Sequence, residues 1–386
     1  FYCMVRTFIR RFFLITYFII VAFFLAACLS PLLNPAVWWP FGFLGLAFPY
    51  LLIVLLLFLA GWLFARSRWS WLAIVVLLLG WKNIASVFAF HPFRSFDKEK
   101  KEAGALRIMT WNTKGFFPPE GGVSKKKARI AHRESIFGVI RDYDPDIIAI
   151  QEFYTIESVK WFNNLSYLRN MGYRYYFFPG DFTRYKDNHS GTAIFSKYPI
   201  IDSVRTYMPQ SEGDNVESLL SADIVCNTDT IRVFTGHLQS YRFMPADYSN
   251  FSKIRSDRNE RIDASKSIIR KMRTAFEKRA VQTDIIRGKL DESRYPEIFC
   301  GDLNDVPNSY AYFSVKNNKR DAFIAGGFGF GQTFYNFSSN FMRRLPTLRI
   351  DYIFTDPRFT IKQCTRVPVI LSDHIPVVAD IQLNVQ

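Results

Sequence analysis

The strongest constraint on this chain is the distribution of its charged residues. Residues 1–96 contain no Asp or Glu and only seven Lys or Arg, whereas residues 97–386 carry the other 42 basic and all 34 acidic residues. A long segment without acidic residues and rich in Leu, Phe and Trp is typical of a region that lies in a lipid bilayer. We therefore predict two regions that meet near Phe96, a membrane region at 1–96 and a soluble domain at 97–386.

The first region contains three apolar stretches of the length that a transmembrane helix needs, which is about 20 residues. We predict three transmembrane helices at 12–29, 41–64 and 69–90. An alternative is a signal peptide followed by a buried helical domain, because Leu25–Cys28 (LAAC) resembles a lipoprotein cleavage box. The two further apolar stretches, which follow without any soluble sequence between them, favour the transmembrane interpretation.

Basic residues beside the apolar stretches predict the orientation, because cytoplasmic ends of transmembrane helices carry an excess of Lys and Arg. Three spans that start in the cytoplasm place the soluble domain outside it, as in a multi-pass protein of the inner membrane. Lys82 and Asn83 interrupt the third stretch, and the domain faces the cytoplasm instead if that stretch does not cross. The basic residues that indicate the cytoplasmic side are Arg6, Arg10, Arg11, Arg66 and Arg68.

The soluble region alternates short apolar runs with two amphipathic stretches. Lys127–Tyr143 and Asn259–Lys289 carry apolar residues at helical spacing. Many short strands with few long helices predict a layered α/β sandwich. No Cys-x-x-Cys pair occurs, so neither a zinc site nor a redox pair is indicated. The predicted strands are Leu106–Trp111, Ile147–Ile150, Thr192–Phe195, Leu219–Val225, Ile231–Thr235, Glu297–Cys300, Arg349–Phe354 and Val377–Ile381.

Several predicted strands end in, or adjoin, a side chain that can bind a metal or move a proton. Each of these residues alone has an ordinary structural explanation, such as a turn, a solvated end or a satisfied histidine. Their shared position is informative, because functional groups gather at the ends of strands on rigid scaffolds. The residues are Asn112, Glu152, His237, Asp302, Asn304, Asp351, Asp373 and His374.

The residue types in this set fit the hydrolysis of a phosphoester. A hard divalent cation prefers oxygen ligands. The attacking water needs a group that takes its proton, and the developing phosphoryl charge needs hydrogen-bond donors. The corresponding candidates are Asn112, Glu152 and Asp373 for the cation, Asp351 with His374 for the proton, and Asn304 with His237 for the charge.

Seven motifs follow one another in the soluble region: MTWNT (109–113), IIAIQE (147–152), HSGTAIFSKYPI (189–200), FTGHLQS (234–240), CGDLND (300–305), RIDYIF (349–354) and LSDHIPV (371–377). In this order they resemble the endonuclease/exonuclease/phosphatase (DNase I-like) superfamily. Two further stretches, Arg279-Ala280-x-Gln282 and Asn308-Ser309-Tyr310, resemble features of a bacterial membrane-anchored subgroup. The resemblance implies a four-layered α/β sandwich with two facing mixed sheets. It also implies a Mg²⁺ or Mn²⁺ ion and in-line attack by water on a phosphoester.

The resemblance assigns three of the candidates to the metal. Glu152 resembles the principal metal-binding glutamate of the family, and Asn112 resembles the asparagine beside it. Asp373 resembles the aspartate near the metal. None of the seven motifs carries a residue that would forbid the family's chemistry, so the resemblance implies an active enzyme that depends on a divalent metal.

The other five candidates resemble the family's catalytic group. Asp302 resembles the aspartate that positions the nucleophilic water, and Asn304 resembles the asparagine that contacts the scissile phosphate. His374 resembles the catalytic histidine, with Asp351 as its carboxylate partner. His237 resembles the second histidine, which in some members aids leaving-group protonation or phosphate binding.

The substrate stays open at this point. Nucleic acid, phospholipid and inositol phosphate all contain the phosphoester bond that the family cleaves, and the bilayer is the one further partner indicated. No obligate protein partner is indicated. Segments 240–260 and 320–346 are the expected selectors of substrate, and the second contains a glycine–aromatic loop at 326–331. The alternative function is a catalytically inactive, membrane-tethered binding module with the same fold.

Overall fold

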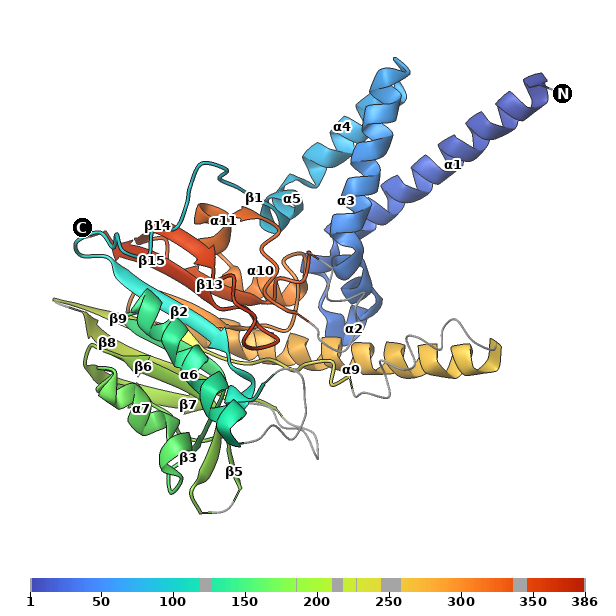
Figure 1. Ribbon diagram of the computed structural model, residues 1–386. Coiled ribbons are helices and arrows are strands. Elements are labelled where there is room, and N and C mark those ends of the chain that lie inside the picture. The colour runs from blue at the N-terminus through green and yellow to red at the C-terminus, as the bar shows by residue number, and fades with distance from the viewer. Residues whose placement is uncertain are drawn as a thin grey trace.

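The computed structural model describes residues 2–118, 126–184, 186–209, 218–226, 228–243, 258–335 and 346–384. In Figure 1 a sandwich of sheets and helices occupies one side, and a group of apolar helices projects from its other side. The sandwich contains both sheets and all of the predicted site residues. Apart from its link to the projecting helices, this part of the chain has the layered α/β architecture that the sequence predicts.

One sheet of the sandwich has six strands, of which β9 and β10 are parallel and the other pairs antiparallel. The register pairs Asp302 at the end of β10 with Asp351 at the start of β13. The backbone pairing of the two strands alone therefore places these two carboxylates side by side. In spatial order the strands are β11 (Arg320–Asp321), β13 (Asp351–Thr355), β10 (Glu297–Asp302), β9 (Asp229–Thr235), β8 (Leu219–Cys226) and β7 (Ile200–Thr206).

The second sheet has seven strands and also contains one parallel pair, β2 with β3. The two strands run towards the same edge, where β2 ends at Asn112 opposite Gln151 of β3. The order is β14 (Phe359–Arg366), β15 (Val377–Leu383), β2 (Leu106–Asn112), β3 (Ile147–Ile156), β6 (Asn188–Ser196) and β4 (Tyr175–Phe177), with β5 (Phe182–Arg184) paired to β6 as well.

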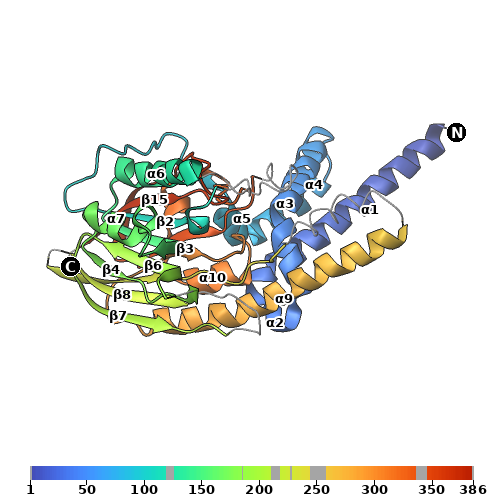
Figure 2. The same ribbon diagram turned by 60° about the horizontal axis from the view of Figure 1, so that its bottom comes forward.

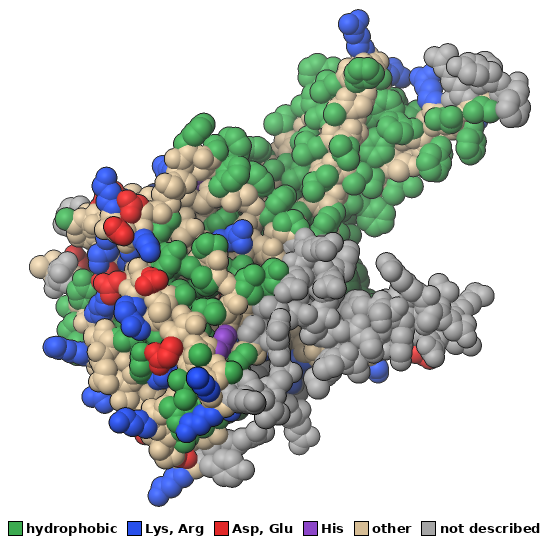
Figure 3. Space-filling model, in the orientation of Figure 1, with side chains coloured by type: hydrophobic (Ala, Val, Ile, Leu, Met, Phe, Trp, Pro, Cys, Tyr) green, Lys and Arg blue, Asp and Glu red, His purple; other side chains and the backbone are tan. Residues whose placement is uncertain are grey.

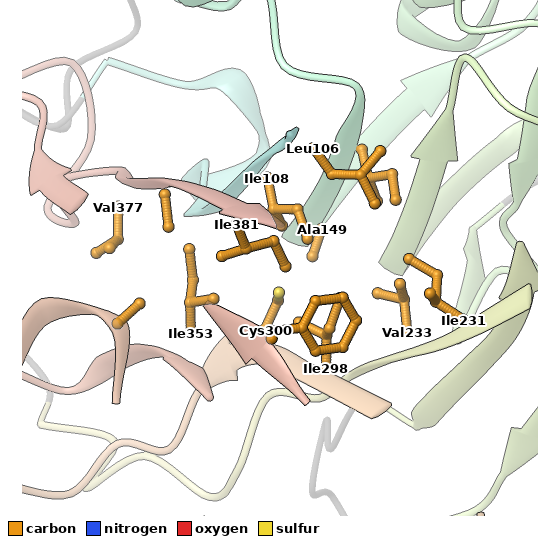
Figure 4. Packing of buried hydrophobic residues seen from close by; sticks show 14 of the residues in the cluster. Leu106, Ile108, Ala149, Ile231, Val233, Ile298, Cys300, Ile353, Val377 and Ile381 are labelled. Carbon is orange, nitrogen blue, oxygen red and sulfur yellow. The ribbon is translucent and has the colours of Figure 1, made fainter. Parts of the chain in front are cut away.

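The main core fills the space between the two sheets. Ile108 and Ile381 point from the seven-stranded sheet towards Ile231 and Ile298 of the six-stranded sheet, as Figure 4 shows. Each such fully buried side chain contributes roughly 1.5–3 kcal/mol through removal of apolar surface from water. This cluster holds the two sheets, and hence the strand ends that carry the polar residues, in a fixed relation to each other.

Helices cover the outer face of each sheet. On the seven-stranded sheet Phe137 of α6 and Leu168 of α7 are buried against Ile148, and on the six-stranded sheet Ile286 of α9 and Tyr312 of α10 are buried in a third cluster. Figure 2 shows α6 and α9 on opposite sides. The four-layered α/β sandwich is therefore confirmed. The helices are α6 (Lys126–Tyr143), α7 (Asn164–Asn170), α9 (Arg258–Asp291), α10 (Tyr310–Lys316) and α11 (Ala322–Gly326), with short turns η2 (Lys114–Phe116) and η3 (Lys160–Phe162).

The projecting helices include two that are long and apolar enough to cross a membrane, Thr7–Leu32 and Pro40–Phe64, each with a mean hydropathy of 2.7. A third span exists only if α4 and α5, which are bent by 68° at Gly80, count as one. The third predicted helix is thus broken at this glycine. The elements are α1 (Tyr2–Cys28), η1 (Ser30–Leu32), α2 (Pro35–Trp38), α3 (Pro40–Phe64), α4 (Trp69–Leu79) and α5 (Trp81–Val87).

Polar contacts join α5 to the sandwich just after the bend at Gly80. Asn83 of α5 is buried, and its Nδ2 donates to Oδ1 of Asn308 at 2.7 Å. Asn308 in turn donates to the carbonyl oxygen of Ala27 at the end of α1 (2.9 Å). Asn83, which interrupts the apolar run in the sequence, therefore faces the sandwich. Just beyond α5, β1 (Ala89–Phe90) pairs with β12 (Phe328–Gly329) of the sandwich.

Two basic residues of the projecting helices lie at ends that are away from the sandwich, whereas a third, Lys82, belongs to α5 beside the sandwich. Arg66 and Arg68 follow α3 and precede α4, and Figure 1 places this turn and the N-terminus at the far side of the molecule. Figure 3 shows apolar side chains along the helices and Lys or Arg side chains at their tips. The near ends, by contrast, contact the sandwich.

Candidate active site

The eight residues singled out in the sequence meet at one edge of the sandwich. Glu152, His237, Asn304, Asp373 and His374 line a single pocket of about 220 Å³. The remaining three residues lie beneath it and are almost completely buried, because they belong to strand ends packed between the layers. These three are Asn112, Asp302 and Asp351.

Glu152 reaches the pocket through an irregularity in β3. Its backbone is left-handed, with φ of 51°, and the pairing of β3 with β6 shifts register between Ile150 and Phe153. A bulge of this kind redirects a side chain from its regular face, and a left-handed glutamate is held only where its surroundings compensate the strain. Nδ2 of Asn112 donates to Oε1 of Glu152 at 3.1 Å and fixes that orientation.

Asp302 is the buried centre of the site. Its Oδ2 lies 3.3 Å from Nδ2 of Asn112, 3.5 Å from Nε2 of His237 and 3.6 Å from Nδ1 of His374. Burial raises the pKa of the Asp302 carboxyl to about 6, and the charge of Asp351 adds to this rise, while the two histidines and the backbone N–H of Asn304 oppose it. Asp302 is therefore a far better proton acceptor than an exposed aspartate.

His374 and Asp351 form a buried ion pair. Nδ1 of His374 lies 3.1 Å and 3.0 Å from the two carboxylate oxygens of Asp351, and His374 is only 5% exposed. Burial alone would lower the pKa of His374, but the charges of Asp351 and Asp302 outweigh it and raise the pKa to about 10. The two neighbouring carboxylates therefore favour the protonated imidazole.

Thr333 places Asp351, and the sequence did not indicate it. Its Oγ1 accepts hydrogen bonds from the backbone N–H groups of Ile350 (2.9 Å) and Asp351 (3.1 Å). The next residue, Phe334, packs edge-on against the His374 ring at 5.1 Å. Both lie within the 320–346 segment predicted to select substrate, of which residues 336–345 lie outside the described chain.

Asn304 and His237 sit beside Asp302 through backbone contacts. The backbone N–H of Asn304 donates to Oδ1 of Asp302 at 2.8 Å, and its side-chain Nδ2 donates to the carbonyl oxygen of Leu238 at 2.9 Å. His237 forms an isolated parallel bridge with Asp302. The backbone of Asn304 is left-handed, with φ of 50°, which turns the chain sharply after β10. Together these contacts bring both side chains to the same wall of the pocket.

Asp373 forms an ion pair with Lys114, a residue that the sequence did not indicate. Nζ of Lys114 lies 2.7 Å from Oδ2 of Asp373. Burial would raise the pKa of Asp373, but the charges of His374 and Lys114 and a hydrogen bond from Ser372 outweigh it and hold the pKa below its ordinary value. Lys114 stands two positions after Asn112 at a strand end, and this spacing is the one signal that could have suggested it.

Helix α9 supports the loop that follows His237. Arg279 is 1% exposed; it donates to the carbonyl oxygen of Gln239 at 2.9 Å and pairs with Asp305 at 3.2 Å. Gln282 accepts the backbone N–H of Gln239 at 2.9 Å. The two α9 residues thus hold the loop whose next residues, from Ser240 onward, line the pocket.

The described residues contain one group of three metal-ligating side chains within 4.8 Å of one another, which consists of Asp302, Asp351 and His374. The metal set expected from the resemblance is different. Glu152 and Asn112 contact each other directly, whereas Asp373 pairs with Lys114. The pocket and the residues directly beneath and beside it therefore combine these four carboxylates with two histidines and a lysine, which is an arrangement suited to cations and phosphoryl groups.

Similarity to one solved structure supports the fold, and two others are less similar. An endonuclease/exonuclease/phosphatase from Beutenbergia cavernae is 20% identical, with a TM-score of 0.50, and the match covers 74% of this chain and 72% of that chain. The human nocturnin catalytic domain with bound sulfate is 16% identical (TM-score 0.47, covering 74% and 98%), and a humanised D. rerio TDP2 is 17% identical (TM-score 0.47, covering 72% and 100%). No curated protein matches the sequence.

Two family models match the chain. Residues 10–87 match a domain of unknown function, which comprises most of the projecting helices. Residues 109–374 match the Endonuclease/Exonuclease/phosphatase family, and this range extends from β2 to His374. Members of that family are hydrolases of phosphoester bonds and generally use a divalent metal. Because this match spans more than half of the sequence, the chain belongs to the Endonuclease/Exonuclease/phosphatase family.

Proposed function

We propose that this protein is a membrane-anchored phosphoesterase that depends on a divalent metal and cleaves its substrate by attack of water. The observation that carries the proposal is the buried Asp302–His374–Asp351 cluster beneath a pocket that Glu152 also lines. A proton acceptor with a raised pKa and a fixed cation lie side by side there. Hydrolysis of a phosphoester requires both, one for the water and one for the phosphoryl oxygens.

The donors around Glu152 fit Mg²⁺ or Mn²⁺, which prefer oxygen ligands and commonly bind through one or two carboxylates with water. The Glu152 side chain is 41% exposed and lies against the amide of Asn112. We place the ion there, with Asp373 near it, because a cation among Asp302, Asp351 and His374 would break the hydrogen bonds of His374. The bound ion would supply positive charge to the attacking and leaving oxygens.

The chain's own residues divide the remaining work. Asp302 takes the proton of the attacking water, since its raised pKa suits that role. His374, held as a cation by Asp351, stabilises the charge on the phosphoryl group. An amide nitrogen carries two hydrogens, so Asn304 can donate to a phosphoryl oxygen and keep its bond to Leu238. His237 stands beside Asp302 for leaving-group protonation or phosphate binding.

The assay that tests this proposal uses the full chain in detergent with Mg²⁺, Mn²⁺ or EDTA. The substrates represent the three classes that the family resemblance leaves open, which are nucleic acids (DNA and RNA), phospholipids and inositol phosphates. His374→Ala should lower turnover by about 10²–10³-fold, the usual cost of removing one group that stabilises developing charge. His91→Gln is the matched control, because His91 contacts the carbonyl oxygen of Ile324 instead of the pocket.

Turnover that requires metal and falls only in His374→Ala would support the phosphoesterase. A folded, metal-supplied protein that binds one of these substrates without cleaving it would instead favour the inactive binding module.

We also propose that the protein is a multi-pass inner-membrane protein with its sandwich outside the cytoplasm. Support for this orientation comes from Arg66 and Arg68, which lie at the helix ends away from the sandwich.

A further inference from the structure

A second cavity lies among the projecting helices. Its volume is about 530 Å³, and only apolar side chains face it. It opens between α3 and α4, with α5 and two phenylalanines at the end nearest the sandwich. The lining consists of Leu52, Ile53, Leu56, Ile74, Leu77, Leu78, Trp81, Ile84, Phe88 and Phe330. We call this cavity the apolar groove.

One face of α3 runs from the active-site pocket to the apolar groove. Leu46 lines the pocket that contains His374, and Ile53 lines the groove. Tyr50 stands between them, and its hydroxyl is 2.9 Å from Oγ1 of Thr347 in the sandwich. Residues spaced by four and then three positions share one face of a helix, so this path along α3 rises by roughly 10 Å.

A segment of the sandwich joins the same two cavities. Phe330 lines the groove and contacts Phe88 at 5.2 Å, whereas Phe334 lines the active-site pocket and packs on His374. Phe330 belongs to the glycine–aromatic loop noted in the sequence. Two independent stretches of chain, one helical and one a loop, therefore connect the pocket to the groove within a few residues each.

We propose that the apolar groove binds an acyl chain of a membrane lipid whose phosphoester occupies the pocket at His374. This inference rests on the proposed function and names its substrate class as an amphiphilic phosphoester. A nucleic acid has no chain of apolar groups that could fill such a groove. A bilayer lipid has one, and it would reach the groove directly, because Leu78 and Trp81 at its rim are 68% and 64% exposed on helices that suit a membrane.

Exposed aromatic residues continue the apolar surface beyond the groove. Phe90 is 72% and Phe93 is 100% exposed, and Phe90 pairs with Phe328 across the β1–β12 ribbon. Large exposed apolar patches mark sites of contact with a membrane or a partner. Phe90 belongs to β1, which follows α5 directly, so this apolar surface continues from one wall of the groove.

The test compares two chromogenic phosphodiesters with the same scissile bond, methyl p-nitrophenyl phosphate and hexadecyl p-nitrophenyl phosphate. Ile53→Trp and Leu78→Trp fill the groove with apolar volume in the full-length protein. Leu63→Trp is the matched control, since Leu63 is exposed on the same helix and does not line the groove. Loss of two buried methylenes already costs roughly tenfold in affinity. The groove variants should therefore lose about tenfold or more in kcat/KM on the hexadecyl ester alone.

Equal kcat/KM for the two esters in the wild type would contradict binding of an acyl chain in the groove. An undiminished preference for the hexadecyl ester in both groove variants would contradict it as well. Failure to cleave either ester would count against the phosphoesterase itself. A readout that does not need turnover separates the two cases. A hexadecyl phosphate with a photoactivatable diazirine at the end of its chain should cross-link to α3 or α4 beside Ile53, and less so in Ile53→Trp. Cross-links that map elsewhere would also overturn the groove.

Discussion

His374 is held by both oxygens of one carboxylate, and this geometry fixes its orientation as well as its charge. A hydrogen bond to Nδ1 leaves the opposite ring nitrogen as the one that a substrate can meet. His374 and its neighbour Asp302 differ in the charge state that their surroundings favour. The imidazole is favoured as a cation, and Asp302, equally buried, is favoured more than usual as the neutral acid.

The raised pKa of His374 predicts how stability depends on pH in EDTA. The pKa rises from about 6.5 in the unfolded chain to about 10 in the folded protein. The His374–Asp351 pair therefore makes its full contribution to the free energy of unfolding below pH ~6.5. That contribution is lost as the pH rises through the folded pKa, by up to roughly 1.4 kcal/mol per pH unit. Chemical denaturation of wild type and His374→Gln, measured between these two values, should show the decline in the wild type and a smaller one in the variant. Parallel curves would contradict the ion pair.

At the residue scale, the sequence identified the polar groups that lie in motifs but not the residues that hold those groups in place. All eight candidates lie in or directly beneath one pocket, because seven lie at or near strand ends at the same edge and the irregularity in β3 turns Glu152 towards it. Lys114 and Thr333 were missed. Lys114 meets Asp373 across 259 positions, and Thr333 holds Asp351 across 18, so neither contact has a local signature.

At the scale of elements, close packing between α3 and the sandwich depends on a glycine. A Cβ at Gly45 would lie 2.7 Å from the carbonyl oxygen of Asn308 and 2.8 Å from Oγ of Ser30. A Cβ at Gly61, farther along the same helix, would meet nothing within 4 Å. The two positions therefore offer a matched pair for the contact between helix and sandwich.

Gly45→Ala should destabilise the protein by about 1–3 kcal/mol, since forcing volume into a packed interface costs this much. Gly61→Ala should be neutral or raise stability by up to about 1 kcal/mol, because alanine is the better helix former. Thermal unfolding in detergent measures both. Equal melting temperatures for the two variants would mean that α3 does not pack on the sandwich as described.

The sequence predicted buried elements well and exposed or bent ones poorly. The apolar run IIAI marked β3, and the helical spacing in Lys127–Tyr143 marked α6. Strand β7 was missed, because it is an edge strand whose residues are mostly half-buried or exposed. Lys82 and Asn83 marked an interruption of the third apolar stretch, but the bend at Gly80 was not predicted, since the contact between Asn83 and Asn308 has no local signature.

For the whole molecule, the sequence predicted two regions, and the structure adds that they contact each other closely. Composition separates residues 1–96 from the rest, but nothing local indicates that Leu46 lines the active-site pocket. Such contacts arise only when both parts are folded. A soluble fragment that begins at 97 would lack this wall of the pocket, so assays on the full chain are the appropriate ones.

The proposed orientation predicts which residues an impermeant reagent can reach. Glu292→Cys, on an exposed site of the sandwich, should react with a membrane-impermeant maleimide added to intact cells with a permeabilised outer membrane. Ala65→Cys, exposed at the far ends of the helices, should react only after lysis. Both variants should be made in a chain with Cys3 and Cys28 replaced by Ser, because Cys28 is only partly buried whereas Cys226, Cys300 and Cys364 are buried. The reverse pattern would place the sandwich in the cytoplasm.

The most direct test of the central claim is a metal titration of phosphoester hydrolysis by the full chain after EDTA treatment. Loss of a group that merely orients a metal ligand already weakens metal binding about 10–100-fold. Glu152→Gln should therefore need at least about tenfold more Mg²⁺ or Mn²⁺ for half-maximal rate. His374→Ala should lower the maximal rate without that shift. A wild type that needs no metal, or variants that respond to metal as the wild type does, would contradict a metal-dependent phosphoesterase at this site.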